Sequence, residues 1–91
     1  MQILAGTQKR LEFNGTEFVQ SDKGDWLIAS LNFVQFQELR LLEGDQHIFG
    51  SILRAVVSLP GDVPVADFVA NPLPQFIHPL YQAIWAHTLG N

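Results

Sequence analysis

The C-terminal third of the chain is almost uncharged, and this limits how the chain can fold and stay dispersed in water. From Ala55 to Asn91 the only charged side chains are Asp62 and Asp67. The same stretch holds four large aromatic side chains: Phe68, Phe76, Tyr81 and Trp85. A small domain has little interior relative to its surface, and large exposed apolar patches usually mark contact surfaces. We therefore expect part of this stretch to contact another protein or another copy of the chain.

Length and composition predict a single folded domain over residues 1–91. The hydrophobic fraction of the 91 residues is 47%, as in ordinary globular domains. Disordered chains are polar and highly charged, whereas only 15% of these residues are charged. A chain of this length can bury one hydrophobic core without disulfides or a structural metal.

The charge pattern argues against nucleic acid and anionic membranes as partners. The formal net charge is -4, and the five basic residues are scattered rather than gathered in a patch. Unbroken apolar runs are short, which excludes a membrane-spanning segment of about 20 residues. The N-terminus shows no signal-peptide pattern. Together with the absence of cysteine, this predicts a cytoplasmic location.

The first 30 residues are predicted to form a β-hairpin or a three-stranded antiparallel sheet. Asn14-Gly15 lies between two short apolar arms and is typical of a two-residue type I′ turn. Leu11, Phe13 and Phe18 would share one face of the hairpin. A third strand is expected over residues 26–30, because three strands with one apolar face are more stable than an isolated hairpin.

Residues 31–43 can be read as a helix or as a continued strand, and we favour the helix. Asn32 and Gln35 have the spacing of a capping box, and Gly44 stands where a helix often ends. The apolar residues of this segment fall on nearly every side of a helical wheel, which is typical of a buried helix.

The clearest predicted helix covers residues 45–59, with Asp45 as its N-cap and Pro60-Gly61 at its end. One face carries an apolar stripe formed by Ile48, Phe49, Ile52, Leu53, Val56 and Val57. The opposite face carries polar residues: His47, Ser51, Arg54 and Ser58. Gly50 lies near the edge of the stripe and would allow another segment to approach closely.

Two further helices are predicted in the charge-poor stretch. A short helix is expected over residues 62–71, with Asp62 as its cap. Residues 71–74 include two prolines, Pro72 and Pro74, and are expected to separate this helix from the next one. A last helix is expected over residues 79–89, with His78 as a cap and Gly90 at its C-terminal end. The predicted fold class is therefore α+β, with three to four helices after the N-terminal strands.

The polar residues do not form a recognisable catalytic or metal-binding pattern. His47, His78 and His87 are not spaced for a metal site on one helix. The carboxylates have structural explanations as helix caps or solvent-facing residues. The glycines are isolated, so no phosphate-binding loop is indicated. We predict a chain that is not an enzyme and that needs no cofactor or metal.

The segment ELRLLEGD, residues 38–45, resembles the small tail-assembly chaperones of tailed bacteriophages. Those proteins begin with a short extended segment, followed by a helix that ends in an acidic-glycine step and by further helices with a proline-rich turn. The resemblance covers residues 31–67. It implies a non-enzymatic protein that covers apolar helical stretches of the tape-measure protein and helps recruit tail-tube subunits.

Taken together, the sequence predicts a protein-binding or assembly module. Aromatic side chains anchor many protein interfaces. The predicted contact residues are therefore the four aromatic ones and the aliphatic residue next to Phe76: Phe68, Phe76, Ile77, Tyr81 and Trp85. Residues 63–77 are the first place where we expect a partner. Two alternatives stay open: a structural homo-oligomer subunit, and a small-ligand or enzymatic domain built around a pocket with His78, His87 or Asp67. The aromatic residues could also be ordinary core.

Overall fold

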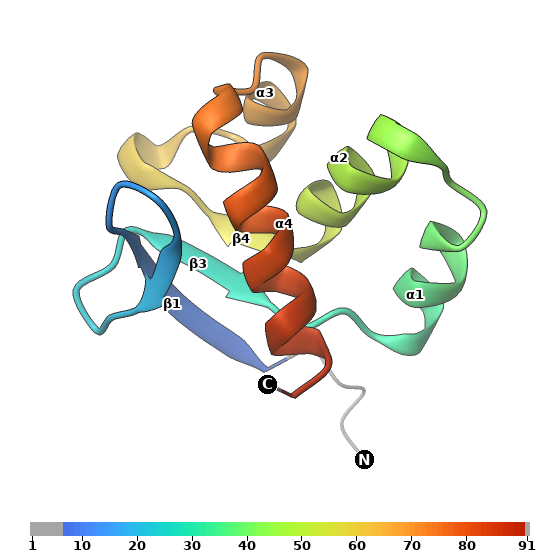
Figure 1. The fold of residues 1–91 in the computed structure, drawn as a ribbon, viewed down its shortest axis with the longest axis horizontal. Coiled ribbons are helices and arrows are strands. Elements are labelled where there is room, and N and C mark those ends of the chain that lie inside the picture. The colour runs from blue at the N-terminus through green and yellow to red at the C-terminus, as the bar shows by residue number, and fades with distance from the viewer. Residues whose placement is uncertain (1–6, 91) are drawn as a thin grey trace.

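The computed structural model describes residues 7–90 and has the predicted α+β class (Figure 1). Residues 1–6 and 91, which the single-domain prediction includes, lie outside the described part. The strands are β1 (Gln8–Phe13), β2 (Phe18–Gln20), β3 (Trp26–Ala29) and β4 (Val56–Ser58). The helices are α1 (Phe33–Leu39), α2 (Gly44–Ala55), α3 (Val65–Ala70) and α4 (Pro74–Thr88), with a 3₁₀ turn, η1 (Pro60–Asp62), before α3. All strand pairs are antiparallel, in the order β2-β1-β3-β4.

The hairpin between β1 and β2 lies where it was predicted, but its turn has a different type. Phe13 pairs with Phe18, so residues 14–17 form the connection. The side-chain Oδ1 of Asn14 accepts hydrogen bonds from the backbone N–H groups of Thr16 and Glu17, at 3.0 and 2.9 Å. Among the described residues Asp62 is the only one besides glycine with a positive φ. The predicted type I′ turn, which needs a positive φ at Asn14, is therefore wrong.

Strand β4 was not predicted. The helix expected to continue to Leu59 ends at Ala55, and Val56 enters an extended conformation with φ -79° and ψ 124°. Two consecutive β-branched residues favour a strand over a helix, and the free edge of β3 offers hydrogen-bonding partners to them. Ser58 and Val56 pair with Leu27 and Ile28 around a register irregularity. The sheet therefore has one strand more than expected, and it comes from the segment predicted to be helical.

The N-cap of α1 agrees with the sequence, while several helix limits do not. Asn32 and Gln35 form the predicted capping box. The helix ends at Leu39, four residues before Glu43, and the next helix starts at Gly44 with Glu43 as its N-cap. The prediction of Asp45 as the N-cap is therefore wrong, because its amide already lies in the first helical turn.

The two helices of the charge-poor stretch also begin elsewhere than predicted. Pro64 takes the N-cap position of α3, and Asp62 makes no side-chain cap. Helix α4 starts at Pro74, whose fixed φ suits a first helical turn. Pro79 therefore lies inside the helix and His78 does not cap it. Gly90 follows α4 as predicted, and its N–H donates to the carbonyl of His87.

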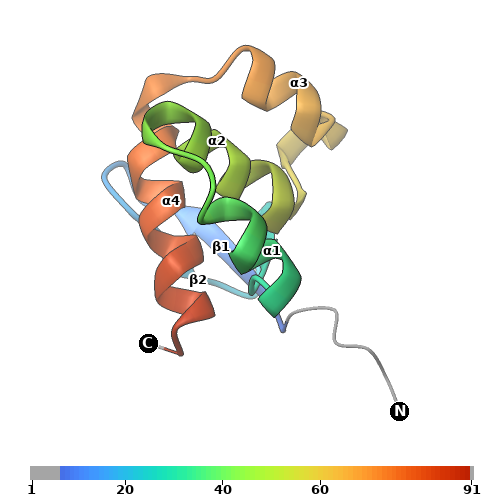
Figure 2. The same cartoon turned by 90° about the vertical axis from the view of Figure 1, so that its right-hand side faces the viewer.

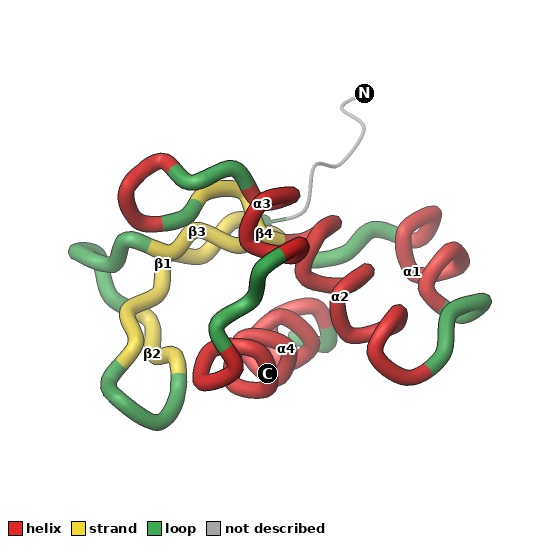
Figure 3. The backbone as a smooth tube through the Cα atoms, turned by 90° about the horizontal axis from the view of Figure 1, so that it is seen from above, coloured by secondary structure: helices red, strands yellow, loops and turns green. Residues whose placement is uncertain are grey.

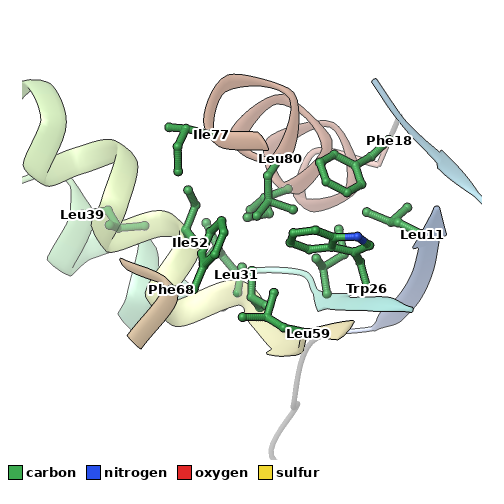
Figure 4. Packing of buried hydrophobic residues seen from close by; sticks show 14 residues of the cluster. Leu11, Phe18, Trp26, Leu31, Leu39, Ile52, Leu59, Phe68, Ile77 and Leu80 are labelled. Atoms are coloured by element: carbon green, nitrogen blue, oxygen red, sulfur yellow. The ribbon is translucent and has the colours of Figure 1, made fainter. Parts of the chain in front are cut away.

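One hydrophobic core lies between the sheet and the helices. Side chains alternate along the strands, so that Leu11, Phe18, Trp26, Ile28 and Val56 face inward. Helix α4 covers this face with Leu80 and Ile84, and Figure 4 shows Leu80 close to Phe18 and Trp26. Helix α2 lies beside α4, and α1 lies at the side of the molecule away from the sheet (Figures 1 and 3).

Candidate protein-contact surfaces

The predicted contact residues divide into core and partly exposed side chains. Phe68 and Ile77 are each only 8% exposed and belong to the core. Phe76 is half-buried in an aromatic cluster with Phe13, Phe18 and Trp26, with ring centroids 4.9 to 6.2 Å away. Neither Phe68 nor Ile77 therefore projects from the surface, because a small domain draws most of its large apolar side chains into its core.

Tyr81 and Trp85 are half-buried on α4, where they pack around His47 of α2. The His47 ring stacks on Trp85 at 5.9 Å and meets Tyr81 edge-on at 5.7 Å. Phe36 of α1 closes the group by an edge contact to Trp85 at 5.7 Å. These aromatic rings therefore join three helices, and they leave only part of Tyr81 and Trp85 available to a partner.

The polar face predicted for residues 45–59 is turned inward at two of its positions. Ser51 is fully buried; its hydroxyl donates to the carbonyl of His47 at 2.8 Å and accepts from the Trp85 indole Nε1–H at 3.3 Å. The Nδ1 of His47 lies 3.1 Å from the carbonyl oxygen of Leu39. A carbonyl can only accept, so His47 donates from Nδ1 and satisfies the open C-terminal end of α1. His47 and Ser51 thus have structural roles between the helices.

Exposed apolar side chains gather instead on α1, which the sequence predicted to be buried. Phe33 is 72% exposed and Val34 is 65% exposed. The N-terminal end of α1 adjoins the end of α4, where the N–H of Leu31 donates to the Thr88 hydroxyl at 3.0 Å and Leu89 is also exposed. We call Phe33, Val34, Phe36 and Leu89 the α1 face. Figure 2 shows α1 below α2 and beside the C-terminal part of α4.

Apolar residues on nearly every side of the helical wheel predicted a buried α1, and this was wrong because the helix has only seven residues. Such a helix can bury one side against α2 and leave the rest exposed. Its close contact uses Gly50, where an added Cβ would lie within 3.2 Å of the Leu39 side chain and 2.9 Å of the Leu42 side chain. The close approach that the sequence indicated at Gly50 is therefore present, with α1 and the turn after it as the approaching segment.

A second apolar surface is a hollow in the stretch where the sequence predicted a partner. Its volume is about 160 Å³, and six side chains line it: Trp26, Leu59, Pro60, Val63, Phe68 and Leu73. Val63 and Leu73 are about half exposed at its rim. Phe68 therefore forms the floor of an apolar depression, although it does not project from the surface.

Other hollows on the described surface are more polar. One of about 320 Å³ is lined by Glu12, Phe13, Lys23, Asp25 and Trp26, and one of about 190 Å³ lies between the β1–β2 hairpin and α4. His78, His87 and Asp67 line none of these three hollows. Within residues 7–90, no three His, Asp or Glu side chains lie close enough together to hold a metal ion.

The described helices are also too short or too polar to cross a lipid bilayer. Comparison with models of known protein families, with curated protein sequences and with solved structures found no match.

Proposed function

We propose that this chain is a non-enzymatic protein-binding module that docks a partner protein on the α1 face. The observation that carries the proposal is the exposure of Phe33 and Val34 on α1. No residue from 31 to 37, a range that includes most of this helix, is charged. Such a surface is costly to leave in water, because each large apolar side chain gains about 1.5–3 kcal/mol when fully buried. A partner that covers the α1 face would recover that free energy.

The chemistry of the α1 face fits a helical partner. Amphipathic helices bind to partners through apolar side chains at i, i+3 and i+4 spacing. Phe33 and Phe36 have this spacing on α1, and Phe36 is held in place by its edge contact with Trp85. A fixed aromatic anchor loses little side-chain entropy on binding. Tyr81 and Trp85 would contribute to binding through their exposed edges and through the support they give to Phe36.

A tail-assembly chaperone of tailed bacteriophages is the specific form of this function that we propose. Its client would be an apolar helical stretch of a tape-measure protein, which matches the uncharged α1 face in chemistry. The cytoplasm is the proposed compartment, since the chain has no cysteine. A net charge of -4 without a basic patch supports protein rather than nucleic acid or an anionic membrane as the partner.

The proposal can be tested by co-expression with the tape-measure protein from the same genome. Wild-type chain is expected to bind it in a stable complex, while the double variant Phe33→Ser, Val34→Ser is expected to lose the complex. A matched control, Val19→Ser with Val57→Ser, removes exposed apolar side chains from the sheet and should bind normally. Equal binding by all three proteins would refute the α1 face as the docking site.

A second candidate function is a structural homo-oligomer subunit. Two features of the same chain favour it: the exposed side chain of Leu41, and the apolar hollow that Phe68 of α3 helps to line. Together they could form a contact between two copies. Sedimentation velocity across a range of concentrations would separate the two functions. An oligomer that forms from the purified chain alone supports the subunit, whereas a monomer at all concentrations that binds the tape-measure protein supports the chaperone.

A further inference from the structure

The turn between α1 and α2 presents a fixed apolar knob. Leu41 is 84% exposed, the highest value among the large apolar side chains of the described residues. Its backbone is held by hydrogen bonds from the N–H of Leu41 to the carbonyl of Glu38, at 3.2 Å, and from the N–H of Leu42 to that of Leu39, at 3.0 Å. Arg40, also exposed, precedes it. The backbone of the turn is therefore fixed, and an apolar side chain and a cation project from it into solvent.

The hollow lined by Trp26, Leu59, Pro60, Val63, Phe68 and Leu73 matches this knob in size and polarity. Its volume is about 160 Å³, and an apolar cavity of roughly 150 Å³ is large enough to bind benzene. One leucine side chain is of comparable size. The wall is formed by apolar and aromatic side chains, so a leucine entering it would exchange water for van der Waals contacts.

The two charges beside the hollow are negative, opposite to that of Arg40, which directly precedes the knob; the exposed acid near the knob, Glu43, stands two residues after it. Asp62 precedes the rim residue Val63, and Asp67 precedes Phe68. Both carboxylates are exposed, and no Lys or Arg follows Arg54 in the sequence. A cation next to an inserted side chain would therefore meet carboxylates with no competing cation from this stretch. Such complementarity selects the partner more than it adds affinity.

The knob and the hollow lie on opposite sides of one molecule. The views in Figures 1 and 3 both place the α1–α2 turn at one end and the segment from β4 to α3 near the sheet. The molecule extends 33 × 31 × 24 Å along its principal axes. Leu41 therefore cannot occupy the hollow of its own chain.

We infer that the hollow is a docking site for Leu41 of a second copy of this chain, with Arg40 of that copy facing Asp62 and Asp67. The contact joins two different surfaces, so each copy keeps one free knob and one free hollow. Head-to-tail contacts of this kind close into rings or extend into filaments. The inference rests on the proposed self-association but does not depend on the α1 face.

Cross-linking tests the contact directly, because the natural chain contains no cysteine. Glu43→Cys places a thiol next to the knob, and Ala66→Cys places one on α3; both positions are exposed. A short bis-maleimide added to a mixture of the two variants should give a heterodimer. The double variant, with both thiols on one chain, should give a ladder of longer oligomers. A Glu43→Cys mixture with Gln20→Cys, an exposed site on β2, serves as the control.

Substitutions at the knob and at the charges on both sides of the contact determine whether Leu41 and Arg40 cause the cross-link. Leu41→Asp in the Glu43→Cys chain should reduce the yield to that of the Gln20→Cys control. Arg40→Glu should also reduce it, and Asp62→Arg with Asp67→Arg on the Ala66→Cys chain should restore it. A yield that Leu41→Asp leaves unchanged, or a Glu43→Cys homodimer that dominates the mixture, would overturn the head-to-tail contact.

The result can be separated from a failure of the proposed function. Phe33→Ser with Val34→Ser should leave the cross-linked ladder intact while it abolishes binding of the tape-measure protein. Loss of the ladder from this double variant would show that copies associate through the α1 face instead, and would overturn the inference. Circular dichroism of each variant checks that the fold is retained, as expected for substitutions at exposed positions.

Discussion

At the scale of single residues, the described glycine with the least room for a side chain is Gly24, in the loop between β2 and β3. Gly24 is buried, and a Cβ added there would overlap the backbone carbonyl of Leu11. The guanidinium of Arg10 donates to the Gly24 carbonyl at 3.1 Å, which holds the loop against β1. The obstacle is backbone in the middle of a paired strand, so it cannot move aside as a flexible side chain would.

Gly24→Ala is expected to lower the free energy of unfolding by about 3 kcal/mol, in the range of overpacking mutations. Gly44→Ala is the matched control. An added Cβ there meets no atom within 4 Å, and its only cost is the positive φ of 58°, about 1 kcal/mol. Urea unfolding of both variants measures the difference. Equal losses would mean that the loop shifts to accept the methyl group.

At the scale of secondary-structure elements, the most informative segment is the junction of α2 and β4. The sequence placed Val56 and Val57 on one buried helical stripe, while the structure places them on opposite faces of a strand. Val56 is 6% exposed and Val57 is 45% exposed. Substitutions at Val56 and Val57 should therefore differ in their effect on stability, because only the Val56 side chain contributes to the core.

Val56→Ala should cost about 2 kcal/mol of stability through lost burial and a residual cavity. Val57→Thr should change stability by less than about 0.5 kcal/mol, as for most surface substitutions. Thermal or chemical denaturation of the pair measures both values. Similar losses at the two positions would favour the continuous helix that the periodicity predicted.

Local signals predicted the elements that depend on nearby residues. The capping box at Asn32 and Gln35, the inward Leu11 and Phe18, and the glycine after α4 all follow from side chains within a few positions of one another. Strand β4 depends on β3, some 30 positions away, whose free edge the local pattern does not contain. Tertiary pairing of this kind routinely overrides helical periodicity.

The contact surfaces were harder to predict than the fold. The aromatic and uncharged composition of the C-terminal stretch pointed to Phe68 and Ile77 as contact residues, but composition does not say which side chains face the core. Phe33, Val34 and Leu41 were missed because an all-round apolar helix is normally a buried one. The hollow between Trp26 and Leu73 joins residues from distant segments. The sequence did single out residues 63–77 as a place for a partner, and Val63, Phe68 and Leu73 line that hollow.

At the scale of the whole molecule, the two tryptophans report on opposite parts of one core. Trp26 lies in the sheet against Phe18, Phe68 and Phe76. Trp85 lies at the meeting point of α1, α2 and α4 through Phe36 and His47. Helix α4 connects the two groups, since it carries both Phe76 and Trp85. Leu80 and Ile84, which lie between these two residues on α4, are fully buried and belong to the core cluster. A single cluster predicts a single cooperative unfolding transition.

The single-tryptophan variants Trp26→Phe and Trp85→Phe test this cooperativity. Within each variant, the fluorescence of the remaining tryptophan and the far-ultraviolet circular dichroism should give the same thermal midpoint. The midpoints of the two variants can differ from each other, since each substitution changes the core. A lower fluorescence midpoint than circular dichroism midpoint in Trp26→Phe would instead mean that α1 and its neighbours unfold first.

The position of α4 in the chain also has a consequence for how the protein is made. The sheet face with Phe18 and Trp26 is covered by α4, and every other described element precedes that helix. On the ribosome, the strands emerge well before the helix that shields them. During that interval the nascent chain carries an uncovered aromatic surface, which exposes it to aggregation and to cellular folding factors. The core can therefore close only after residues 74–88 have left the ribosome.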